Sequence, residues 1–109
     1  MKTALVTGGS RGIGAAVCRR LAEDGLRVVV HYNQNKGKAE ALVRELTEKT
    51  GLPHLALPAE LAERAQVEEL FRLAGPVDVL VNNAGIAQQK LFTDITEDDW
   101  RRMFAVDVD

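Results

Sequence analysis

The sequence predicts an α/β fold, a doubly wound parallel sheet with the strand order 3-2-1-4, from three observations. Short apolar runs alternate with segments whose apolar residues recur at helical spacing, in the order β-α-β-α-β-α-β-α. A glycine-rich turn separates the first apolar run from the first helical segment. The runs at 28–30 and 77–81 are almost continuously apolar, as in parallel strands covered on both faces. With right-handed crossovers, the chain turns back past strand one to place strand four.

The first part of the chain predicts two strands with a helix between them. Residues 3–7 (TALVT) form a short apolar strand, and the glycine turn follows it. The helical spacing after the turn is carried by Ile13, Ala16, Val17 and Leu21. Gly25 is a plausible stop for this helix. The β-branched run 26–32 predicts the second strand.

The second part predicts two more strands and three more helices. A loop at 33–37 leads into a helix that ends near Gly51, with its apolar positions at Ala39, Leu42, Val43 and Leu46. A weaker strand lies within 52–59. The third helix stops at Gly75-Pro76, and its apolar positions are Val67, Leu70, Phe71 and Ala74. Residues 77–84 predict the fourth strand, and Thr96 with Asp99 predicts the capped start of a fourth helix.

The composition is that of an ordinary globular domain and excludes several classes of partner. The 109 residues are 46% apolar and 28% charged, with a formal net charge of −2. Because no basic run is present, we expect neither a nucleic acid nor a membrane surface as partner. No apolar stretch approaches the length of a membrane span.

The cysteine and the histidines predict a cytoplasmic protein without a metal site. Cys18 is the single cysteine, so no disulfide forms within the chain and a reducing cytoplasm is the simpler expectation. Cys18 lies beside the apolar stripe of the first helix, where packing is expected rather than chemistry. His31 and His54 are isolated and lack the spacing of metal ligands.

The glycine turn suggests a binding site for a dinucleotide. Gly8, Gly12 and Gly14 follow the first strand and open the first helix. In a Rossmann-like sheet this turn lies at the carboxyl edge, where the free N–H groups of a helix start can hold a pyrophosphate if no Cβ intrudes. A tight turn that packs the helix closely without any ligand remains the alternative. No Gly-Lys-Ser/Thr sequence follows, so a P-loop is excluded.

Two motifs together resemble the short-chain dehydrogenase/reductase family: TGGSRGIG at 7–14 and NNAG at 82–85. The resemblance covers the whole chain but only the first half of the family's usual domain, and within the family it is nearest to 3-oxoacyl-[acyl-carrier-protein] reductases. Residues 85–109 also resemble a branch of elongation factor P 5-aminopentanone reductases. The resemblance implies an oxidoreductase that transfers a hydride between NADP(H) and a carbonyl or alcohol.

The family's functional residues carry over by position. Gly8, Gly12 and Gly14 would form the phosphate turn, and Thr7 and Asn82 would tie the first strand to the fourth. The other cofactor contacts implied are Ser10, Arg11, Ile13, Tyr32, Asn33, Glu60, Leu61, Asn83, Ala84 and Gly85. Glu60 stands where the family usually has an Asp beside the adenine. Asp107 stands at the position of the family's catalytic Asn; an Asp cannot donate as the amide does, and only a role of its main-chain carbonyl would survive.

The end of the second strand favours NADP(H), while NAD(H) remains possible. NAD recognition usually places an Asp or Glu there, but this chain has Tyr32 followed by Asn33, and no carboxylate before Glu40. A carboxylate would repel the 2′-phosphate of NADP, and its absence permits one. Arg11, or else Lys36, is the candidate partner of that phosphate.

Residues 1–109 are expected to be a single NAD(P)-binding domain, the N-terminal part of a longer enzyme. The family's chemistry needs a Ser and a Tyr-x-x-x-Lys, and the single tyrosine, Tyr32, lies at the cofactor end. The expected partner is a small or carrier-bound carbonyl substrate, with a homo-oligomer when full-length. A dinucleotide-binding module without catalysis is the alternative. An epimerase of nucleotide sugars is disfavoured by the glycine spacing and by NNAG.

Overall fold

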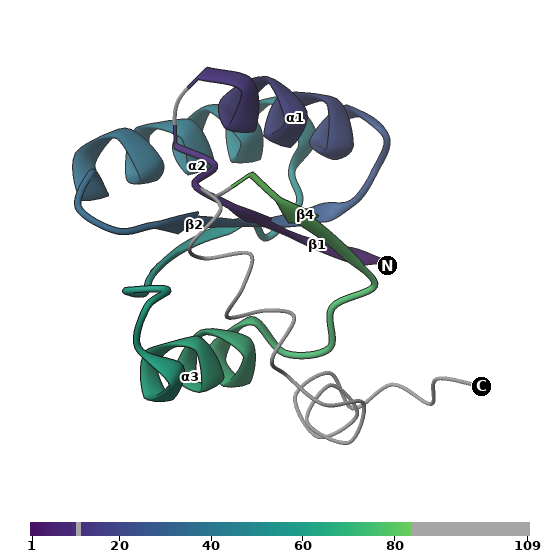
Figure 1. Cartoon of the computed structure of the whole chain (residues 1–109). Helices are drawn as coiled ribbons and strands as arrows, with labels where there is room; N and C mark the ends of the chain where they lie inside the picture. Colours follow the sequence, from purple (N-terminus) through teal and green to yellow (C-terminus); the bar gives the residue numbers. More distant parts are fainter. Residues whose placement is uncertain (11, 84–109) are drawn as a thin grey trace.

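A computed structural model of the chain describes residues 1–10 and 12–83. The helices and strands alternate along these residues, as Figure 1 shows. Their bounds are β1 Thr3–Thr7, α1 Gly12–Glu23, β2 Arg27–Tyr32, α2 Lys36–Thr50, β3 Leu55–Pro58, α3 Arg64–Ala74 and β4 Val79–Asn82. The fourth helix predicted from Thr96 lies outside the described residues. No helix in the described ranges is long and apolar enough to cross a bilayer.

The four strands form one parallel sheet in the order β3-β2-β1-β4. The predicted fold class and strand order are therefore confirmed. Helices α1 and α2 cover one face of the sheet, and α3 covers the other (Figure 1). This arrangement is the doubly wound one, since successive crossovers deposit helices on both faces.

The two central strands, β1 and β2, carry the core because both of their faces are covered. Leu5 and Val29 pack on the α3 side, whereas Val6, Val28 and Val30 pack on the α1–α2 side. All five are completely buried. Burying a side chain of this size stabilises the fold by about 1.5–3 kcal/mol.

Helices α2 and α3 bury the faces that their sequences predict. Ala39, Leu42 and Leu46 of α2 are buried, and Val43 is half-buried. The predicted stripe of α3, formed by Val67, Leu70, Phe71 and Ala74, is buried throughout. Gly51 ends α2 in the left-handed region (φ 73°) and donates its N–H to the Thr47 carbonyl at 2.8 Å. Gly75 likewise follows the end of α3.

The predicted face of α1 is wrong. Ile13 is 76% exposed and Ala16 is also exposed, while Val17 and Leu21 are only partly buried. The residues that α1 buries are instead small ones, Gly14, Ala15, Cys18 and Ala22. The first turn of α1 lies against the glycine turn so closely that a Cβ on Gly14 would overlap backbone atoms. Periodicity in large apolar residues therefore does not locate the buried side of this helix.

Two element boundaries also differ from those predicted. Helix α2 begins at Lys36, inside the predicted loop at 33–37, and β4 is shorter than the apolar run at 77–84. Val77 is buried against α3 before the strand begins. Asp78 then joins β4 to β1: its Oδ2 accepts the Thr3 N–H at 2.8 Å, and its own N–H donates to the Thr3 carbonyl at 2.8 Å.

Candidate functional site

The candidate site lies where the four parallel strands end. Val6 pairs with Val30, Thr7 pairs with Asn82, and Tyr32 pairs with Pro58, so the strands finish at one edge of the sheet. The residues that follow these strands belong to the glycine turn, to 33–35, to 59–63 and to Asn83. In α/β sheets of this kind, ligands bind outside the carboxyl ends of the strands.

The glycine turn brings α1 into direct contact with the end of β1. A Cβ on Gly14 would lie 2.5 Å from the Gly8 carbonyl oxygen and 2.9 Å from the Gly9 Cα, so no side chain fits at position 14. Gly8 and Gly12 have φ angles of 61° and 59°, in the left-handed region that favours glycine. The bare positions are therefore required by the turn itself.

Gly9 is part of the same contact, although the sequence pattern did not single it out. A Cβ there would lie 3.0 Å from Cys18 Sγ and 3.1 Å from the Val6 carbonyl oxygen. Cys18 is completely buried beneath the turn, and burial raises the pKa of its thiol to about 12. The thiol donates to the Gly9 carbonyl at 3.7 Å. Cys18 is thus a packing residue, as predicted.

Hydrogen bonds within the protein use the peptide groups of Gly8 and Gly9. The Gly8 N–H donates to His31 Nδ1 at 2.9 Å, and the Gly9 N–H donates to the His31 carbonyl at 3.1 Å. The Gly8 carbonyl accepts from Asn83 Nδ2 at 3.2 Å. The first N–H groups of α1, beginning at Gly12, have no partners within the helix, and they carry the positive end of the helix dipole. Free N–H groups at the start of a helix can bind an anion.

The ends of β1 and β4 are joined as predicted. The Thr7 hydroxyl donates to Asn82 Oδ1 at 3.0 Å, and the Asn83 N–H donates to Thr7 Oγ1 at 2.9 Å. Thr7 is completely buried, so these bonds are sheltered from water. Asn83 itself is exposed, and its side chain reaches from β4 to the glycine turn.

The ends of β2 and β3 also meet through predicted site residues. Asn33 Nδ2 donates to Glu60 Oε2 at 3.1 Å, and the Ala62 N–H donates to Glu60 Oε1 at 3.2 Å. The Glu60 carboxylate is therefore oriented from both of its oxygens. Leu61, which follows Glu60, is buried in the core with α3.

Four other predicted residues lie in different surroundings. Tyr32 is buried in the core of the α1–α2 face and lines a groove of about 540 Å³ between α2 and β3. Lys36 lines the same groove, with its Nζ 3.9 Å from Glu40. Ile13 is exposed at the first turn of α1, and Ser10 is half-buried in the glycine turn. Arg11, Ala84, Gly85 and Asp107 lie outside the described residues.

Sequence reasoning missed His31 as part of the site. Its ring is buried, with Nδ1 on the Gly8 N–H and Nε2 2.8 Å from the Ala59 carbonyl oxygen. Burial lowers the pKa of His31, against the opposing effects of the Ala59 hydrogen bond and the Glu60 charge. A signal was present in the sequence: an imidazole that directly follows three consecutive valines near the end of β2.

Comparisons with known proteins agree with this geometry. The sequence model of the short chain dehydrogenase family matches residues 2–109. The 3-oxoacyl-[acyl-carrier-protein] reductase FabG of Staphylococcus epidermidis is 45% identical over 103 residues, which cover 91% of this chain and 42% of the reductase. The chain thus spans less than half the length of this curated relative.

Solved structures give the same result. A blue fluorescent protein from a metagenomic library, in complex with NADPH, matches with a TM-score of 0.73 and 46% identity, covering 94% of this chain and 43% of that one. A short-chain dehydrogenase from Sphingobium yanoikuyae in complex with NADPH matches with a TM-score of 0.69 and 35% identity over 78% of this chain and 34% of its own. With the glycine turn and the strand order, these matches establish that the chain belongs to the short chain dehydrogenase family.

Proposed function

We propose that this chain forms the cofactor-binding part of an NADP(H)-dependent oxidoreductase that acts on a carbonyl or alcohol substrate. The observation that carries the proposal is the position of the α1 N-terminus at the carboxyl edge of the sheet, which is fixed by the contact of Gly14 with Gly8 and Gly9. That contact sets the N-terminus of α1 at the carboxyl edge of the sheet, where its free N–H groups can bind a pyrophosphate. When bound, NADPH supplies the hydride for reduction of a carbonyl.

The chain's own residues would hold the cofactor along this edge. The turn residues Gly8, Ser10, Gly12, Ile13 and Gly14 would face the pyrophosphate, and Asn33 and Glu60 the adenosine. Asn83 already links the end of β4 to the turn, which supports a role beside the cofactor. Arg11, Ala84, Gly85 and Asp107 remain candidates by position.

The end of β2 supports NADP(H) as the preferred cofactor. Tyr32 is buried, so the exposed residue at this strand end is Asn33, an amide without charge. Asn33 donates to the Glu60 carboxylate, and the end of β2 itself, within the described residues, supplies no acidic residue of the kind that binds a ribose 2′-hydroxyl. The relatives from the metagenomic library and from Sphingobium yanoikuyae were both solved with NADPH, in keeping with this choice.

The preference for NADP(H) can be tested by cofactor-binding measurements on the full-length protein. We expect tighter binding of NADPH than of NADH by fluorescence titration. Asn33→Asp should weaken NADPH binding by about tenfold and leave NADH binding less affected, because it adds a negative charge beside the ribose. Leu73→Glu adds the same charge on the outer face of α3 and is the matched control. Equal affinities of the unmodified protein for both cofactors would contradict the proposal.

The substrate proposed is a ketone of the 3-oxoacyl-[acyl-carrier-protein] type, supported by the resemblance to FabG. The test is NADPH oxidation by the complete gene product with a 3-oxoacyl thioester. A homo-oligomer and a cytoplasmic location belong to the same proposal. Binding of NADPH without turnover of any carbonyl would favour the second candidate function, a dinucleotide-binding module. The free N–H groups at the start of α1 support that candidate as well, because they can bind a pyrophosphate whether or not a reaction follows.

A further inference from the structure

One residue, His31, joins the glycine turn to the end of β3. Its Nδ1 accepts the Gly8 N–H at 2.9 Å, and its Nε2 lies 2.8 Å from the Ala59 carbonyl oxygen. Because a carbonyl oxygen can only accept, the ring proton is on Nε2, and Nδ1 is then free to accept. The contacts therefore select one neutral tautomer of the ring.

The backbone of His31 holds the next residue of the turn. Its carbonyl accepts the Gly9 N–H at 3.1 Å, so the N–H groups of both consecutive glycines are bound by one residue. The Gly8 carbonyl accepts from Asn83 Nδ2 and is the atom 2.5 Å from a Cβ at Gly14. The orientation of the Gly8 peptide groups therefore decides how closely the first turn of α1 approaches the sheet.

We propose that His31 is the positioning residue of the phosphate turn, and that its neutral ring holds Gly8 in the orientation that binds the pyrophosphate. This inference rests on the proposed function, which assigns dinucleotide binding to the turn. A protonated ring would carry an N–H on both nitrogens. The Gly8 N–H would then face another donor, and the turn would lose the contact that orients it.

The surroundings of the ring favour the neutral form. Burial lowers the pKa of His31, while the Ala59 hydrogen bond and the Glu60 carboxylate act in the opposite direction. Within residues 1–10 and 12–83, Glu60 is the charged group that acts on the ring, and the partners at the turn and after β3 are backbone groups. The ring is therefore neutral at pH 7. It gains a second proton only when the pH falls below the ordinary pKa of a histidine side chain.

Two substitutions separate the two contacts of the ring. In His31→Asn, the amide oxygen can take the place of Nδ1 and keep the Gly8 bond, while the Ala59 contact is lost. In His31→Gln, the longer amide reaches toward Ala59, and the Gly8 acceptor is lost. We expect NADPH affinity at pH 8 to stay within about twofold for Asn and to fall about fivefold or more for Gln, the effect of one hydrogen bond.

The pH dependence supplies a readout that a purely structural role would not move. The 2′-phosphate of NADPH itself titrates near pH ~6. The pH dependence of NADPH affinity in His31→Asn therefore gives the contribution of the cofactor's own titration. Between pH 8 and the midpoint of the His31 ring's own titration, the unmodified protein should lose about twofold more NADPH affinity than His31→Asn does, because half of its rings then carry a second proton. His54→Asn is the matched control, because His54 Nδ1 also accepts a backbone N–H, from Val28, but at the start of β2. Its profile should follow that of the unmodified protein.

A measurement without variants guards against a variant that does not fold. In the unmodified protein, the NMR signals of the Gly8 amide and the His31 ring should shift with one midpoint, in the absence of cofactor. Equal NADPH affinities of the Asn and Gln variants, or a Gly8 signal that ignores the ring's titration, would overturn the role of His31 alone. No NADPH binding by the unmodified protein at pH 8 would overturn the proposed function and this role with it.

Discussion

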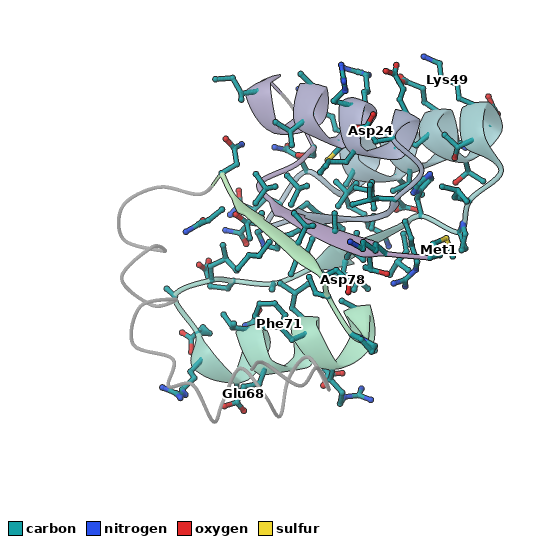
Figure 2. All side chains as sticks on the ribbon, turned by 90° about the vertical axis from the view of Figure 1, so that its right-hand side faces the viewer. Met1, Asp24, Lys49, Glu68, Phe71 and Asp78 are labelled. Atoms are coloured by element: carbon teal, nitrogen blue, oxygen red, sulfur yellow. The ribbon has the colours of Figure 1, made fainter. Side chains whose placement is uncertain are left out.

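The two faces of the sheet are covered by helices of different kinds. Helix α3 buries Val67, Leu70 and Phe71, and Figure 2 shows Phe71 pointing from α3 to the sheet. Helix α1 buries Gly14, Ala15, Cys18 and Ala22 and touches the end of β1 through glycines. Large buried side chains stabilise the packing of α3 on the sheet. Close contacts at glycine positions stabilise the packing of α1. The difference explains why periodicity in large apolar residues located the face of α3 and misplaced that of α1.

The largest effect on stability is expected where volume matters most, at Phe71. Phe71→Ala leaves a cavity in a completely buried site and should cost about 3–5 kcal/mol in the free energy of unfolding. Leu73→Ala is the control on the same helix, because Leu73 is 46% exposed; it should cost under about 1 kcal/mol. Urea unfolding measures both. If the two variants lost equal unfolding free energy, large buried side chains would not be what stabilises the packing of α3.

The matching test of the α1 face is Gly14→Ala, which adds one methyl group where backbone atoms stand. We expect a loss of about 1–3 kcal/mol in stability and of NADPH binding, since α1 must move away from the turn. Gly37→Ala is the control, because a Cβ there meets nothing within 4 Å and position 37 is helical. That control should raise stability by about 0.5–1 kcal/mol. If Gly14→Ala were as stable as the parent, close contact at Gly14 would not be required for the packing of α1.

Acid should weaken both sides of the sheet, because each has a buried histidine. His31 lies at the end of β2 with Ala59, and His54 bonds the Val28 N–H and Thr50 beside α2. Burial lowers the pKa of both rings, so the unfolded chain takes up protons first. Their contribution to stability is complete above pH ~6.5 and is lost as the pH falls toward the folded-state values.

Unfolding free energies at pH 7.5 and 5.5 test this dependence. His31→Asn and His54→Asn should each remove part of the loss, and the double variant should remove more than either alone. If the unmodified protein became more stable as the pH fell from 7.5 to 5.5, and the double variant did not, the two histidines would act in the opposite direction to the expected one.

The smallest effect is expected at Ile13, which the periodicity assigned to the buried stripe of α1. Ile13→Gln should change stability by less than about 0.5 kcal/mol, because the side chain is 76% exposed. Thermal unfolding of the variant without cofactor measures this. A loss comparable to that of Gly14→Ala would restore the predicted face. A loss of NADPH affinity alone would instead agree with Ile13 lying beside the cofactor.

The sequence by itself determined the topology, the face of α3 and the place of the glycine turn. These follow from local patterns: alternating strands and helices, large apolar residues at helical spacing, and glycines after the first strand. The register of parallel strands then brings the strand ends together, and with them the tie between Thr7 and Asn82. Asn33 and Glu60, which the resemblance implied as cofactor contacts, also meet at this edge.

Only the tertiary structure decided which side of α1 is buried, why Gly9 is bare, and what His31 does. Gly9 is confined by Cys18, Val6 and Val30, and His31 bridges Gly8 to Ala59 across separations of 23 and 28 residues. The tertiary structure also places Tyr32 in the core, so that Asn33 is the exposed residue at the end of β2. The physical reason is that local patterns report the size and polarity of neighbours along the chain. Close approach and buried hydrogen bonds depend instead on atoms brought together from distant positions by the packing of helices on the sheet.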